Sequence, residues 1–263
     1  MAYTTDDFRR VDPRDINFAL SYPFAVPVDS YVYVDGHAMA LTDTTSADMM
    51  AWIVSHRGER RTLGDVVHQT AHADMALDRL TPVVAAGSNA SPMQLLRKFQ
   101  QRKDIIVPVL KMPVRDWSVT YARHIAPYGS IPASLEQAPG ETTQLFVNFL
   151  DEEAMEGMHG TESIGTYYQL AEVSLPKADT APWAAGMKAH AYNSHTGHLP
   201  FRPEALETTD TRYPPRSQWQ MQDIVIDLLG EDVSVMEFIA QNFSDEKLRL
   251  EREKRLIEAQ IES

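Results

Sequence analysis

The sequence contains no cysteine in its 263 residues. This absence excludes disulfides, thiolate nucleophiles and thiolate metal sites, and it is typical of proteins that fold in a reducing compartment. The polar start of the chain, residues 1–14, is not followed by an apolar segment of the kind found in signal peptides. No apolar run approaches the roughly 18 residues that a membrane-spanning helix needs. We therefore expect a cytoplasmic protein that does not act at a membrane.

Basic residues are also scarce, because 24 Lys and Arg stand against 37 Asp and Glu, for a net charge of −13. A nucleic-acid surface needs clustered Lys and Arg, and here they gather only in the C-terminal tail, where acids cancel them. Nucleic acid is therefore not an expected partner. The acidic balance is compatible with an amine-bearing ligand. Since 43% of the residues are apolar, the chain can bury a core that holds a polar site.

The hydrophobic pattern predicts helices and strands along the whole chain. Expected strands cover residues 30–35, 38–41, 81–86, 105–111, 117–124, 143–150, 167–175 and 187–192, with a turn at Pro139-Gly140. Expected helices cover residues 46–55, 63–80, 91–99, 151–158, 219–229 and 233–243. This order predicts an α/β (α+β) fold, with an N-terminal extension over 1–80, a main domain over 81–230 and a C-terminal helical tail over 231–263.

The end of the tail, residues 244–263, has acids and bases interleaved with leucine and isoleucine, and Ser244 or Asp245 is suited to cap a helix there. One interpretation is a solvated terminal helix. The other is a helix that pairs with a second subunit and forms a homodimer. The heptad pattern is too short to decide between them.

The most informative local pattern is a strand, a tight loop and a helix start. Residues 81–86 (TPVVAA) are apolar and β-prone, and residues 87–89 (Gly-Ser-Asn) interrupt them. Ser91 is a favourable N-cap, Pro92 suits the first helical position, and Gln94 is placed for a capping box. Exposed backbone N–H groups at such a junction favour negative charge. The loop is therefore a candidate ligand site.

Gly87, Ser88 and Asn89 resemble the YGSN loop of the γ-glutamylcyclotransferase-like superfamily, with Ala86 at the position of the family's tyrosine. In that family the loop ends a strand, and its backbone amides hold the γ-glutamyl part of the substrate. The resemblance covers about residues 81–195.

A second segment carries the same resemblance. Residues 155–168 (MEGMHGTESIGTYY) are similar to the family segment that holds the catalytic glutamate, and Glu162 falls on that glutamate. Ser163 follows it where the family has glycine. Tyr167 or Tyr168 falls on the family's next tyrosine, and both are candidate substrate-binding residues.

The resemblance implies a small mixed β-barrel or sheet flanked by helices, here with helical additions at both ends. It also implies a reaction in which the substrate's α-amine attacks its own γ-carbonyl and releases 5-oxoproline and a free amine. That reaction needs no metal and no cofactor. It needs one carboxylate for proton transfer, Glu162, and amide donors for the oxyanion, which Gly87, Ser88 and Asn89 supply.

Each candidate also has a purely structural interpretation. Gly87 would then be a turn glycine, Glu162 a solvated carboxylate at a helix end, and the inward tyrosine of the pair 167–168 a core residue. The acidic residues Glu152, Glu153 and Glu156 are rivals of Glu162, although their run is typical of an exposed helix face.

Other strings of interest have weaker support. Tyr128-Gly129-Ser130 is a second YGS-like string, but it lacks the asparagine and a capped helix does not follow it. His190, His195 and His198 have spacing that suggests a metal site, but a carboxylate does not accompany them. His124 and His159 are further candidates for proton transfer.

Three functions therefore stay open. The first is a metal-independent enzyme that cleaves a small-molecule γ-glutamyl or related acyl amide. The second is a binding or regulatory module on the same fold, without turnover. The third is an interaction subunit that assembles through its C-terminal helix.

Overall fold

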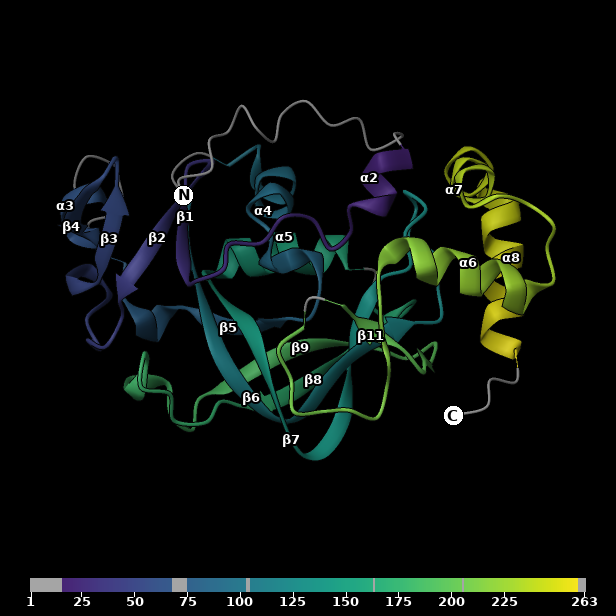
Figure 1. Cartoon of the computed structure of the whole chain (residues 1–263). Coiled ribbons are helices and arrows are strands. Elements are labelled where there is room, and N and C mark those ends of the chain that lie inside the picture. The colour runs from purple at the N-terminus through teal and green to yellow at the C-terminus, as the bar shows by residue number, and fades with distance from the viewer. Residues whose placement is uncertain (1–15, 68–74, 103–104, 163, 205, 260–263) are drawn as a thin grey trace.

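The computed structural model describes residues 16–67, 75–102, 105–162, 164–204 and 206–259. Its centre is a large mixed β-sheet with the strand order β4-β3-β2-β1-β6-β7-β5-β9-β8, in which β10 also pairs with β6 (Figure 1). The strands are β1 (Tyr31–Val34), β2 (His37–Asp43), β3 (Ile53–His56), β4 (Glu59–Thr62), β5 (Thr81–Ala85), β6 (Ile106–Ala122), β7 (Ala133–Leu150), β8 (Tyr168–Ser174), β9 (Lys188–Ser194), β10 (His198–Leu199), and the separate pair β11 (Arg202–Pro203) and β12 (Pro215–Arg216).

Helices cover one face and both ends of this sheet (Figure 1). They are α2 (Ile16–Leu20), α3 (Leu63–Val67), α4 (Pro92–Phe99), α5 (Glu152–Thr161), α6 (Gln218–Leu229), α7 (Val235–Ser244) and α8 (Glu246–Glu258). The predicted α+β class is confirmed. Of the two predicted forms, the sheet is correct and the barrel is wrong, because the order of strands ends at β4 and β8 without closing.

The longest elements form one hairpin. β6 and β7 have 17 and 18 residues, although the sequence predicts two separate strands in place of β6. The predicted turn at Pro139-Gly140 is also wrong, since it lies inside β7. There the ladder shifts register, Asp116 and Gly140 adopt φ values of 63° and 87°, and the Gly140 N–H donates to Asp116 Oδ1 at 2.8 Å. The turn residues therefore make a bulge within a continuous hairpin.

The N-terminal part extends the same sheet. β1 pairs with β2, as the predicted hairpin requires. β1 also pairs with β6, which joins this hairpin to the main sheet. The helix predicted over 46–55 is wrong, because only Met49–Ala51 form a 3-10 turn and β3 follows. Trp52 explains the difference: its buried indole donates to Ser46 O at 2.8 Å and fixes the chain across the turn.

Within the described residues, the helix predicted over 63–80 is correct at α3 and wrong from residue 75 onward, where Leu77–Arg79 make one 3-10 turn. The intervening residues 68–74 lie outside the described part of the chain. No helix in the described ranges is long and apolar enough to cross a bilayer.

The C-terminal helices pack on one another and close one end of the sheet (Figure 1). α6 begins with a capping box between Ser217 and Gln220 and ends at Gly230, whose φ is 64°. Asp245 caps α8, as predicted. The prediction that this helix is solvated is wrong for one of its faces. That face is buried within this chain and carries Arg249, Arg252, Glu253 and Leu256. Pairing of the tail with a second subunit stays a prediction.

α4 and α5 lie side by side above the sheet (Figure 1). Leu95 and Phe99 of α4 and Met158 of α5 pack on residues of β1, β5, β6 and β9 in one buried cluster. This layer fixes the C-terminal end of α5 next to the loop between β5 and α4.

Candidate active site

The loop after β5 has the predicted strand–loop–helix geometry. β5 ends at Ala85, Ser88–Ala90 form a 3-10 turn, and α4 begins at Pro92. The predicted capping box is wrong, because the buried Ser91 hydroxyl donates to Ala25 O at 2.9 Å and makes no cap hydrogen bond. The N-terminal segment therefore ties down the start of α4.

Gly87 is required by close packing. A Cβ on this residue would lie 2.1 Å from the hydroxyl oxygen of Tyr22, far inside van der Waals contact. Its φ of −145° lies outside the left-handed region, so the constraint that the structure shows is the close approach of Tyr22. The Tyr22 hydroxyl is itself fixed, since it accepts from the Ala133 N–H at 2.8 Å. A ring far upstream in the sequence therefore decides that this loop position is glycine.

Glu162 lies at the end of α5. Asp151 caps the start of this helix by accepting from the Ala154 N–H at 2.7 Å. The helix ends at Thr161, and the Glu162 N–H donates to His159 O at 3.2 Å. Because α5 packs on α4, the carboxylate of Glu162 is brought to the loop after β5.

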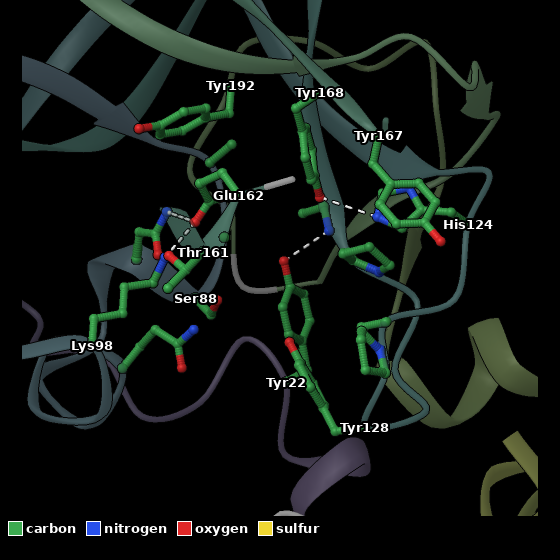
Figure 2. A pocket seen from close by; sticks show the side chains of 18 of the residues that line it. Tyr22, Ser88, Lys98, His124, Tyr128, Thr161, Glu162, Tyr167, Tyr168 and Tyr192 are labelled. Atoms are coloured by element: carbon green, nitrogen blue, oxygen red, sulfur yellow. Dashed lines mark hydrogen bonds and ion pairs between the residues drawn. The ribbon is translucent and has the colours of Figure 1, made fainter. Parts of the chain in front are cut away.

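The Glu162 carboxylate and the loop are in direct contact (Figure 2). Asn89 Nδ2 donates to Glu162 Oε1 at 3.0 Å, and Lys98 Nζ forms an ion pair with the same oxygen. Lys98 Nζ also donates to Thr161 Oγ1 at 2.5 Å. The Lys98 side chain is 4% exposed and that of Glu162 is 14% exposed, so this is a nearly buried ion pair. Charge-assisted hydrogen bonds of this kind hold a carboxylate in one orientation.

A cavity of about 170 Å³ lies beside this ion pair. It is lined by all six predicted site residues, Gly87, Ser88, Asn89, Glu162, Tyr167 and Tyr168. Their catalytic and binding roles stay predictions. The rivals Glu152, Glu153 and Glu156 are exposed and are not among the lining residues.

Sequence reasoning missed several lining residues. These are Tyr22, Lys98, Thr161 and Tyr192, and also Tyr128, which belongs to the second YGS-like string. No local signal marks Lys98, which lies on a short helix with basic neighbours. Tyr22 belongs to an arm that has little periodicity. Only the packing of α2, α4 and α5 around the loop brings these residues to one cavity.

Aromatic rings form the opposite wall of the cavity (Figure 2). The His124 ring stacks on Tyr167 with centroids 4.6 Å apart, and His124 Nε2 lies 3.3 Å from the Tyr168 hydroxyl. Burial lowers the pKa of His124 from 6.5 to about 3, and the nearby Arg249 adds to this effect. Burial also raises the pKa of Tyr168. The His124 imidazole is therefore neutral near neutral pH, and it shares a hydrogen bond with the Tyr168 hydroxyl.

The C-terminal helix supports this wall from behind. The Tyr167 hydroxyl donates to Glu253 Oε2 at 2.8 Å, and Glu253 Oε1 pairs with Arg249 Nη1 at 2.8 Å. The backbone of Ile125 is also bonded to α8. Its N–H donates to Glu253 Oε1 at 3.3 Å, and its carbonyl accepts from Arg249 Nη1 at 3.2 Å. α8 thus holds the residue next to His124 and the hydroxyl of Tyr167 together.

Two of the other candidate histidines have polar side-chain partners. His159 Nδ1 lies 3.0 Å from the Tyr192 hydroxyl, and His198 Nδ1 lies 3.0 Å from Thr120 Oγ1. His190 lies on β9, and His195 follows that strand. Within the described ranges, no three His, Asp or Glu side chains are grouped so that they could hold a metal ion.

No protein-family model matches the chain, and no curated protein sequence matches it. Solved structures give only distant likenesses. The uncharacterized protein PH0828 from Pyrococcus horikoshii is 15% identical with a TM-score of 0.33, over 47% of this chain and 85% of that chain. A gamma-glutamyl cyclotransferase is 12% identical with a TM-score of 0.36, over 70% of this chain and 90% of that chain.

The uncharacterized protein loc79017 from Homo sapiens is also 12% identical, with a TM-score of 0.38 and the same two coverages. All three scores are below 0.5, so no argument about this chain rests on these likenesses.

The buried histidine gives a prediction for acid stability. Between about pH 6.5 and about pH 3 the unfolded chain binds a proton at His124 that the folded chain does not bind. This group therefore makes stability fall as the pH drops through that window, and its effect is absent above pH 6.5. In urea unfolding at pH 7 and pH 4.5, wild type should lose more stability than His124→Asn, whose amide can donate to or accept from Tyr168. Equal losses in the two proteins would contradict a neutral buried imidazole.

Proposed function

We propose that this protein cleaves a γ-glutamyl amide, or a related acyl amide, by intramolecular aminolysis and releases 5-oxoproline and a free amine. One observation carries the proposal: the Glu162 carboxylate and the Gly87–Asn89 loop line the same cavity and are joined by a 3.0 Å hydrogen bond from Asn89. The proposed base and the loop that carries the proposed backbone donors therefore line one small volume. This is the pair of functions that the reaction needs.

In the proposed reaction the substrate's α-nitrogen attacks its own γ-carbonyl carbon. The new C–N bond closes the five-membered ring, and the bond to the leaving nitrogen breaks. The attacking ammonium loses two protons as it becomes the lactam N–H, and the leaving nitrogen gains two as it departs as an ammonium. Glu162 accepts each proton in turn and delivers it to the leaving nitrogen, so the carboxylate is regenerated. The backbone N–H groups of the Gly87–Asn89 loop stabilise the oxyanion. The cavity contributes proximity by holding the substrate in a folded pose.

The contacts of Glu162 suit this role. Among the described residues, its hydrogen bonds from Asn89 and Lys98 both go to Oε1. Oε2 is left for the substrate's ammonium. The ion pair with Lys98 holds the carboxylate in place, so its position does not depend on the substrate.

The direct test is turnover. The purified protein is incubated with a panel of γ-glutamyl amides, and 5-oxoproline is quantified by mass spectrometry against enzyme-free controls, since γ-glutamyl compounds also cyclise spontaneously. We expect protein-dependent release with at least one of these amides. If no member of the panel is converted faster than in the control, the proposed activity is wrong.

A binding module without turnover is the second candidate. The observation that favours it is the Lys98–Glu162 ion pair, because this contact gives the Glu162 carboxylate a structural role that needs no turnover. If calorimetry shows that a ligand binds and the same ligand releases no 5-oxoproline, the protein is a binding module without turnover.

The ion pair also gives a stability prediction. Lys98→Met leaves the nearly buried Glu162 carboxylate without its cation and should lower the free energy of unfolding by about 3 kcal/mol. Urea unfolding measures this loss. The double variant Lys98→Met, Glu162→Gln removes both charges and should recover most of the lost stability. If the double variant is as unstable as the single one, the ion pair is not the cause.

A further inference from the structure

The charges of the candidate active site lie at one end. Of the residues lining the cavity, only Lys98 and Glu162 carry a charge near neutral pH, and they contact each other. Asn89 lies beside them, and its buried Oδ1 has no hydrogen-bond partner within the described ranges. This end therefore offers one cation and one anion to a ligand.

The cation of Lys98 and the anion of Glu162 together complement a zwitterionic ligand. A ligand carboxylate can pair with Lys98 beside Glu162, and a ligand ammonium can donate to Glu162 Oε2. Under the proposed function, the α-amino and α-carboxyl groups of the γ-glutamyl head use these groups. Once Lys98 and Glu162 bind these two groups, this end of the cavity has no further charge for a second ionised group on the ligand.

The other end of the cavity is aromatic and uncharged. It is formed by Tyr128, Tyr167, Tyr168 and the neutral His124 (Figure 2). Pro127, next to Tyr128 in the chain, also lines the cavity and is exposed, so it belongs to the rim. These rings offer apolar surface and hydroxyl groups to whatever part of the ligand extends past the scissile bond.

The nearest cations behind this wall already have partners. The buried Arg249 is paired with Glu253 and bonded to the Ile125 carbonyl. The guanidinium carbon of Arg97 lies 4.7 Å from the ring centroid of Phe18 and 6.0 Å from that of Tyr128, and Arg97 is not a lining residue. A carboxylate placed against the aromatic wall would lose water and gain no cation.

We infer that the leaving amine of the substrate carries no ionised group: the natural substrates are γ-glutamyl amides of uncharged aliphatic or aromatic amines, and not γ-glutamyl amino acids with a free carboxylate. This inference rests on the proposed function, and it follows from the separation of the charged and the aromatic ends of the cavity. The aromatic wall then contributes specificity by packing against the amine's side group.

A matched pair of ligands tests this inference. γ-Glutamylalaninamide and γ-glutamylalanine have nearly the same size and differ at the far end by one negative charge. Isothermal titration calorimetry on Glu162→Gln measures binding of both ligands without turnover. We expect the uncharged amide to bind at least about 10-fold more tightly. Equal affinities, tighter binding of the carboxylate ligand, or binding of neither ligand would overturn the inference.

A charge-gain variant makes the test sharper. Pro127→Lys, made in the same Glu162→Gln background, places a cation at the exposed rim of the aromatic end. We expect this variant to shift the preference toward γ-glutamylalanine by about 10-fold. Pro139→Lys adds the same charge at an exposed position that does not line the cavity, and it should leave the preference unchanged. If both variants shift the preference equally, the effect is only one of net charge and the inference fails.

Failure of this inference is distinguishable from failure of the proposed function. The wild-type protein is assayed for 5-oxoproline release from the same two ligands. No release from either, with the binding preference intact, would overturn the activity and support the specificity of the cavity. Release accompanied by equal or reversed affinity would overturn the specificity alone.

Discussion

Glu162→Gln should lower the rate of 5-oxoproline release by about 10²- to 10⁴-fold, the usual contribution of a general acid–base group. Glutamine keeps the size of the side chain, and its carbonyl oxygen still accepts hydrogen bonds from Asn89 and Lys98. It cannot take the proton of the attacking ammonium. The larger loss should therefore appear in kcat, with a smaller rise in KM because the substrate's ammonium loses its anionic partner. Initial rates over a range of substrate concentrations measure the two constants.

The matched control is Glu156→Gln, which makes the same chemical change on the same helix. Glu156 is exposed and is not among the lining residues, so its rate should equal that of the wild type. Thermal unfolding of both variants checks that each one retains the folded state. If Glu162→Gln keeps the wild-type kcat, proton transfer by this carboxylate is not part of the reaction.

Gly87→Ala should lower both activity and stability, because the new methyl group would lie 2.1 Å from the Tyr22 hydroxyl oxygen. Either the loop or the Tyr22 ring must move. Overpacking of this kind costs about 1–3 kcal/mol. Since the loop carries the proposed oxyanion donors, a shift of about 1 Å would also lower the rate by about 10²-fold. Urea unfolding and the 5-oxoproline assay measure the two losses.

Gly160→Ala is the control for this change. Gly160 lies in α5 close to the site in sequence, and a Cβ there meets nothing within 4 Å. This variant should be neutral or slightly stabilised, because alanine favours helix more than glycine does. Adding Tyr22→Phe to Gly87→Ala removes the clashing oxygen and should restore part of the activity. If Gly87→Ala behaves as Gly160→Ala does, the loop is not held against Tyr22.

The elements that sequence predicted well have their signals close together in the chain. The strand before Gly87, the helix start at Pro92 and the short helix before Glu162 all have their expected places. The helices α6 and α7 were also predicted to within two residues at each end. In each case apolar spacing, a capping residue or a proline sets the boundary locally.

The incorrect predictions share a different cause. Residues 46–55 have helical spacing, but the buried Trp52 and the pairing of β3 with β2 and β4 outweigh it. Ser91 has the sequence of an N-cap, but the chain at Ala25 offers its hydroxyl a tertiary partner. Pro139-Gly140 looks like a turn, and the long ladder of β6 and β7 absorbs it as a bulge. Long-range pairing changed the outcome each time.

The sequence by itself determined the mixed α+β class, the strand–loop–helix junction at Gly87 and the choice of Glu162 as the carboxylate to examine. These depend on local propensity and on short motifs. Only the tertiary structure decided that Lys98 pairs with Glu162, that Tyr22 approaches Gly87, and that α8 supports Tyr167. Those partners are 64, 65 and 86 residues apart in sequence. Their meeting depends on how the helices pack against the sheet, which no local pattern encodes.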